Sequence, residues 1–156
     1  MPDLSDPNPN RRKAMPTDVP ATREELLRAN LQRVLEFEYD GERSRMEVEA
    51  LLHTMDAFPK DRLGCLLDAT LMSIDDNGRE IMSLAPSLTN VGVTRPFAHK
   101  MRGAVSFKSS RFDAALAILD TQPDTISEEE YRRVRKVFEE EYHLVRTTIR
   151  NYRNNL

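Results

Sequence analysis

The last thirty residues constrain the fold of this chain more than any other part of it. Ser127 followed by Glu130 forms a capping box, in which two side chains satisfy the free N–H groups at a helix start. Apolar and aromatic residues then recur at spacings of four and three. The pattern predicts a helix over 128–153, which at about 1.5 Å per residue is roughly 39 Å long. Because a small domain measures about 30 Å, we expect one end of this helix to project.

The apolar face of this predicted helix also reads as an imperfect heptad pattern, with Arg135 as its flaw. One interpretation is an amphipathic helix that packs on its own domain. We favour it because three tyrosines on this face are untypical of a tight coiled coil, since their hydroxyls need water or a partner. The other is a helix that binds a partner protein or a second copy. The candidate interface residues are Tyr131, Phe138, Tyr142, Val145, Ile149 and Tyr152.

Three further helices are predicted in the first half of the chain. A capping box of Thr22 and Glu25 starts the first, and one of Ser44 and Glu47 starts the second. The third is expected to begin at residue 60 and to end near residue 76, where Asn77–Gly78 supplies a left-handed stop. Since the connections are short, we expect the three helices to be antiparallel neighbours in an up-down arrangement.

The segment 79–110 is the least regular part of the sequence. Thr94 is a candidate cap for a short helix that ends at Arg102, residues 104–107 read as a strand without a partner, and another helix begins near Ser110. We therefore predict an all-α fold, a compact bundle of five to six helices with a long C-terminal helix. Residues 21–156 are predicted to form a single helical domain, preceded by a proline-rich disordered arm over residues 1–20.

The composition indicates the cellular compartment of the protein and its relation to membranes. Cys65 is the only cysteine, so an internal disulfide is impossible and a reducing compartment is favoured. No apolar run approaches 18 residues, and the N-terminus has no signal-type apolar core. We expect a cytoplasmic protein that does not associate with membranes.

Motifs for catalysis, phosphate binding or metal binding are absent from the sequence. The five glycines form no phosphate-cradling loop, and there is no G-x-S-x-G or H-E-x-x-H sequence. Glu140 and His143 have the E-x-x-H spacing of di-iron bundles, but Glu49 and His53 are four residues apart and give no second copy. We therefore expect a non-enzymatic protein that has no cofactor and no metal.

The most unusual local feature is an acid-free stretch of 32 residues between Glu80 and Asp113. It carries a charge of +5 in a chain of net charge −3, so the remainder carries −8. Cations interleaved with aromatic rings are typical of single-stranded nucleic acid binding, and we assign Phe107 as the stacking ring. The predicted anion-binding residues are Arg95, His99, Lys100, Arg102, Phe107, Lys108 and Arg111. The leading functional hypothesis is thus a helical binding protein that contacts an anionic partner, with nucleic acid as the first candidate.

The acid-free stretch is also compatible with two different roles. In the first, the protein is an adaptor, a chaperone or a self-assembling structural protein that acts through its helix faces, with the basic segment meeting an acidic protein surface. A homo-oligomer assembled head to tail, basic segment against acidic helix, belongs to this class. In the second, the segment is a solvated connector that lacks acids by chance.

Overall fold

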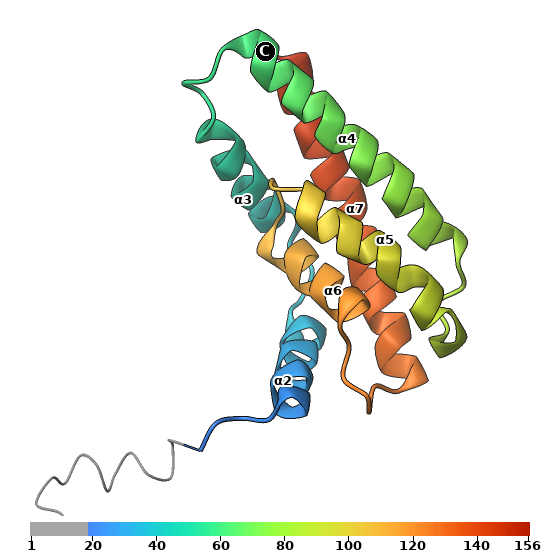
Figure 1. Ribbon diagram of the computed structural model, residues 1–156. Helices are drawn as coiled ribbons and strands as arrows, with labels where there is room; N and C mark the ends of the chain where they lie inside the picture. The colour runs from blue at the N-terminus through green and yellow to red at the C-terminus, as the bar shows by residue number, and fades with distance from the viewer. Residues whose placement is uncertain (1–18) are drawn as a thin grey trace, which may run out of the picture.

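The computed structural model describes residues 19–156, which form six α-helices and no β-strand (Figure 1). The all-α prediction, with five to six helices and a long last helix, is confirmed. The predicted arm lies almost wholly within residues 1–18, outside the described residues. The elements are α2 Arg23–Glu36, α3 Gly41–His53, α4 Lys60–Ser83, the short 3-10 helix η1 Leu88–Asn90, α5 Val91–Ala104, α6 Ser110–Asp120 and α7 Glu128–Asn154.

Helices α4 to α7 form an up-down four-helix bundle. Each packs against the next along the chain, and α7 closes the ring by packing against α4 (Figure 1). The last pair is antiparallel, because Arg135 near the start of α7 contacts the end of α4, and Arg153 at the end of α7 contacts Asp68 near its start. Short connections between sequence neighbours produce this topology.

Helices α2 and α3 lie outside this ring, on the side formed by α6 and α7. Leu31 and Val34 of α2 and Val48 and Leu52 of α3 are buried there. The prediction that the first three helices are successive antiparallel neighbours is wrong. Within residues 19–156, α3 packs mainly on α7 and neither α2 nor α4 packs closely against it. The bundle covers the apolar stripes of α2 and α3, so these two helices bury their apolar side chains without packing against each other.

Helix α7 is the centre of the molecule, although its sequence is strongly polar. It packs against α2, α3, α4 and α6 and is therefore buried over a wide arc. The ring of Phe138 lies 5.6 Å from that of Phe112 and 5.8 Å from that of Tyr142, between ring centroids. Its buried residues are Tyr131, Val134, Arg135, Val137, Phe138, Glu141, Tyr142, Val145, Thr148 and Ile149.

The candidate interface residues of α7 consequently belong to the core of the chain itself. Tyr131, Phe138, Tyr142, Val145 and Ile149 are buried in this core. Tyr152 is partly buried, and its hydroxyl donates a hydrogen bond to Asp56. Because they are buried, these five side chains of α7 are not accessible to a partner in this structure. This agrees with the favoured interpretation, an amphipathic helix that packs on its own domain.

Two helix boundaries differ from the sequence prediction for identifiable reasons. Helix α3 starts at Gly41, because the carboxylate of Asp40 accepts a hydrogen bond from the Arg43 N–H at 3.1 Å. Ser44 is therefore a buried residue inside the helix and not its cap. Helix α4 continues through Gly78, where an added Cβ would overlap the ring of Tyr142. This glycine allows α4 and α7 to approach closely and does not end the helix.

The middle of the chain is more helical than its sequence indicates. Helix α5 begins three residues before Thr94, which is buried inside it and does not cap it. Residues 104–107 form no strand: Val105 and Phe107 enter the core instead. No helix within residues 19–156 combines the length and the apolar content that crossing a membrane requires.

Candidate anion-binding surface

Helix α5 presents the exposed cations of the acid-free stretch. It lies between α4 and α6 and contains no aspartate or glutamate (Figure 1). Its buried side faces the core through Ala98 and Met101. Its solvent side carries Arg95, His99, Lys100 and Arg102, all four of them exposed. Arg95, His99 and Arg102 share one face because residues four and three positions apart point the same way on a helix.

Asp120, at the end of α6, partly neutralises this exposed face. Its carboxylate accepts a hydrogen bond from Arg102 Nη1 at 2.8 Å and lies 3.1 Å from His99 Nδ1. Burial by itself raises the pKa of Asp120, but the hydrogen bonds with His99 and Arg102 outweigh burial and hold this pKa below its ordinary value. Arg95 and Lys100 form no ion pair within residues 19–156, so they are the most available cations of α5.

Lys108 is turned toward the protein and completes the end of α5. Its Nζ donates to the carbonyl oxygens of Arg102, at 3.3 Å, and of Val105. Its side chain is only 12% exposed, and this burial lowers the pKa of the ammonium group. A lysine that satisfies free carbonyls at a helix end is not positioned to meet a phosphate.

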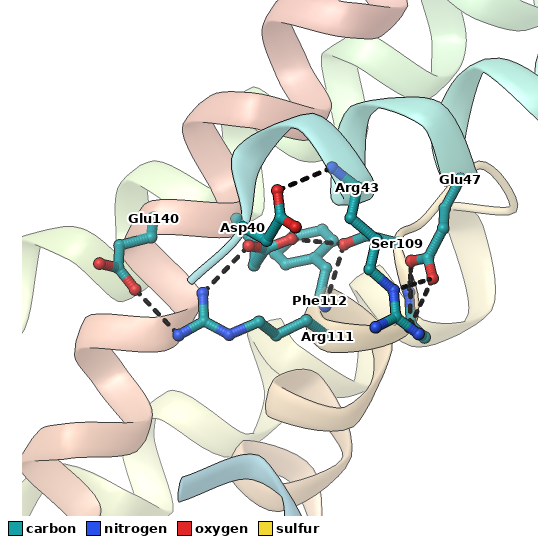
Figure 2. Close-up of polar contacts among 9 residues, drawn as sticks. Asp40, Arg43, Glu47, Ser109, Arg111, Phe112 and Glu140 are labelled. Carbon is teal, nitrogen blue, oxygen red and sulfur yellow. Dashed lines mark hydrogen bonds and ion pairs between the residues drawn. The ribbon is translucent and has the colours of Figure 1, made fainter. Parts of the chain in front are cut away.

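Arg111 is held by two glutamates of α7, Glu140 and Glu141. Figure 2 shows the pair with Glu140. Its Nη2 lies 3.1 Å from Glu140 Oε1, and its Nη1 lies 3.1 Å from Glu141 Oε2. The guanidinium also lies 5.4 Å from the ring centroid of Tyr39. Glu141 has no exposed side-chain surface and accepts a second hydrogen bond from Ser109 Oγ at 2.6 Å. This cluster joins α6 to α7 and leaves Arg111 no free donor pair for an outside anion.

Phe107 is 5% exposed and belongs to the core. The assignment of this ring as a stacking platform does not agree with the structure, because no face of the ring is open to a base. The seven predicted site residues thus separate into two groups. Four lie exposed on α5, whereas Phe107, Lys108 and Arg111 are used in packing and internal pairing.

A solvent-open hollow of about 440 Å³ lies where α2, α3 and α6 meet. Its apolar wall includes Val34 and Phe37. Two of the carboxylates beside it already have partners: Asp40 caps α3, and Glu47 accepts hydrogen bonds from the Ser110 N–H at 2.9 Å and from the Ser110 hydroxyl at 3.0 Å (Figure 2). The hollow has the size of a small-molecule site, but most of its polar side chains are already engaged within the chain.

The histidines do not form a metal centre. Across residues 19–156, no group of three or more histidine, cysteine or acidic side chains is arranged to hold a metal ion. His53, His143, Glu49 and Glu140 line the same groove between α3 and α7. His53 Nδ1 lies 3.2 Å from a carboxylate oxygen of Asp56, so this histidine has a partner within the chain.

Two residues that shape the site were missed by sequence reasoning. Glu141 lies three residues after Phe138 and four before Val145, on the apolar stripe of α7, and this position is a readable sign of burial. Asp120 lies 21 residues from His99, and only the packing of α6 against α5 joins them. No spacing rule connects such a pair.

Comparison with family models, with curated proteins and with solved structures finds no match to this chain. The functional argument therefore depends on the residues of the chain itself.

Proposed function

We propose that this chain is a non-enzymatic binding protein that contacts an anionic partner, nucleic acid first, through the exposed face of α5. One observation supports the proposal most. Arg95, His99, Lys100 and Arg102 are exposed on one helix that carries no carboxylate of its own. A surface of this kind attracts polyanions over several ångströms and neutralises their phosphates on contact.

The arrangement favours backbone contact over base recognition. Phe107 is buried, and Phe97 is partly buried with Lys100 Nζ 5.8 Å from its ring centroid. Because no aromatic platform is open beside the cations, binding is expected to depend on phosphates and to discriminate little between sequences. Phosphate contacts from the three formal cations of α5, Arg95, Lys100 and Arg102, predict a slope of log K against log salt of about −2 on a single strand.

A salt titration with fluorescent single-stranded RNA and DNA tests this function. The double variant Arg95→Ala/Lys100→Ala is expected to lower the magnitude of the slope by about 1.4, because each lost contact on a single strand contributes about 0.7. The double variant Arg62→Ala/Arg79→Ala on α4 is the matched control, since it removes the same charge from exposed positions of a neighbouring helix. Binding that is undetectable at low salt, or that both double variants weaken equally, removes the proposal.

Protein–protein contact is the second candidate function, and exposed apolar side chains favour it. Helices α3 and α4 and the turn between them expose Met46, Leu51, Phe58, Leu66 and Met72. Large apolar side chains exposed on elements that follow one another in the chain are candidate contacts for a partner protein. Light scattering over a hundredfold range of concentration tests self-association. A mass that stays at 18.0 kDa throughout excludes it.

A further inference from the structure

Arg135 of α7 is a buried cation whose charge has no counter-ion. Only 6% of the residue is exposed, and its Nη2 donates to the carbonyl oxygens of Ile81 at 2.7 Å and Leu84 at 2.9 Å. These two bonds complete the end of α4. The other guanidinium nitrogens, Nε and Nη1, are buried without any hydrogen-bond partner. Within residues 19–156 no carboxylate forms an ion pair with this guanidinium.

The charge of Arg135 is only partly offset by its surroundings. The end of a helix carries roughly half a negative charge, so the carbonyls of α4 compensate about half of the guanidinium charge. Burying an ion without a partner is costly, and buried charges in proteins are normally paired. Buried polar groups that lack a partner are rare in folded proteins and call for an explanation.

A cavity of about 470 Å³, open to solvent, lies beside this arginine. The end of α4 and the turn through Pro86 form one wall, and one stretch of α7 forms the other. The α7 wall presents Arg132, Arg135 and Lys136, and Glu139 is the one acid among the lining residues within 19–156. Arg132 and Lys136 are exposed and form no ion pair within the described chain. Two exposed cations, with the charge of Arg135 buried behind them, thus outweigh one carboxylate.

We propose that this cavity binds a small anion of the phosphate class. Arg132 and Lys136 lie three residues before and one residue after Arg135, so all three project from neighbouring positions of the helix. Arg132 and Lys136 make the direct contacts in the proposed site. Nε and Nη1 of Arg135 are closed off from water, so Arg135 acts through its charge from behind the cavity wall. The volume accommodates a free phosphate or a phosphate group that ends a larger molecule.

This site is separate from the α5 surface and does not depend on nucleic acid binding. Its residues belong to α7 and to the end of α4, whereas the proposed nucleic acid contacts belong to α5. Two double variants therefore test the two proposals independently. Loss of RNA binding in Arg95→Ala/Lys100→Ala with unchanged phosphate binding leaves the cavity proposal intact.

The test measures the midpoint of thermal unfolding and the binding isotherm with sodium phosphate, and in parallel with adenosine monophosphate. Ionic strength is held constant with sodium chloride. We expect a saturable rise of the midpoint with phosphate that chloride alone does not produce. Arg132→Ala/Lys136→Ala is expected to weaken phosphate binding at least tenfold. Arg62→Ala/Arg79→Ala is the matched control: it removes the same charge from exposed positions outside the cavity and is expected to leave phosphate binding unchanged.

Two results overturn the proposal: a phosphate effect no larger than that of chloride, or equal phosphate affinity in the native protein and Arg132→Ala/Lys136→Ala. Both positions are exposed, so the variant is expected to fold. Arg135→Lys serves as a further variant, since it keeps the charge and loses the fork that spans two carbonyls. Tighter binding of adenosine monophosphate than of phosphate assigns the site to the end of a larger molecule, and the reverse assigns it to the free ion.

Discussion

The cations of the acid-free stretch lie in two segments, residues 95–102 (the α5 half, exposed) and residues 103–112 (the inward half), and the two segments differ in how their side chains are oriented. Between Arg95 and Arg102 the cations face solvent along α5, whereas Lys108 and Arg111, a few residues further on, are turned inward. Residues 95–102 carry three of the five cations and residues 103–112 carry the other two, and neither segment contains an acid. The difference shows that a run of like charge in a sequence indicates a docking surface only where the local structure keeps its side chains free.

Local structure explains the difference. The α5 half is a regular helix with one side in the core, so every cation on its other side is exposed. The second half is the turn into α6, where free backbone carbonyls engage Lys108 and the buried carboxylate of Glu141 engages Arg111. Turns that join packed helices bring cations next to groups that need a partner.

The largest expected effect on stability comes from Phe107, a buried aromatic ring of the inward half. Phe107→Ala is expected to lower the free energy of unfolding by about 3–5 kcal/mol, because it leaves a cavity in the core. Urea denaturation followed by circular dichroism measures the change. Phe97→Ala, at a partly buried ring on α5, is the control and is expected to cost less. Equal losses would contradict the division between the two halves.

The next effect concerns the buried ion pair. Arg111→Ala is expected to cost about 3 kcal/mol, since it leaves the carboxylate of Glu141 buried with Ser109 as its remaining donor. Arg95→Ala removes an equal charge from α5 and is expected to change stability by no more than about 0.5 kcal/mol. Denaturation of the two variants side by side gives the comparison. An Arg111 variant as stable as the Arg95 variant would show that the cluster in Figure 2 contributes nothing.

A smaller effect concerns Asp120, whose carboxylate contacts His99 and Arg102 of the exposed half. Its pKa is lowered in the folded protein from an ordinary value of 3.8. The charged form therefore stabilises the fold above about pH 3.8, and this contribution is lost as pH falls through the lower folded value. We expect Asp120→Asn to be less stable than the native protein at pH 5, with the difference narrowing toward pH 2. Unfolding midpoints across this range provide the measurement, and a constant difference would contradict the assignment.

The smallest expected effect on stability comes from the exposed cations together. Arg95→Ala/Lys100→Ala is expected to unfold within about 0.5 kcal/mol of the native protein while it loses affinity for single-stranded RNA. Stability and binding are measured on the same preparation. A large loss of stability would show that Arg95 and Lys100 stabilise the fold as Lys108 and Arg111 do. The contrast between the two halves would then not hold.

Sequence alone predicted the parts of the fold that depend on local rules. The capping boxes at Thr22 and Ser127 are present, because each needs only residues three apart. The shared face of Arg95, His99 and Arg102 follows from helical spacing in the same way. The end of α4 was mispredicted because Asn77–Gly78 reads locally as a stop, whereas the ring of Tyr142 needs that glycine inside a helix.

The parts that sequence did not predict depend on contacts between distant segments. The inward orientation of Arg111 requires Glu141, thirty residues further along the chain. Arg135 reads as a flaw in the heptad pattern, but it supplies donors to the end of α4, which lies 54 residues earlier at Ile81. Periodicity shows which side of a helix is apolar, and it does not show which polar residues on that side are matched by a partner.

The central position of α7 has a consequence for how the molecule is made. Helix α3 emerges from the ribosome long before α7, the helix that covers most of its apolar side. During synthesis Val48 and Leu52 therefore stay without their native cover while about 75 further residues are added. Nascent chains that stop before α7 are for this reason expected to be the ones that attract chaperones or aggregate.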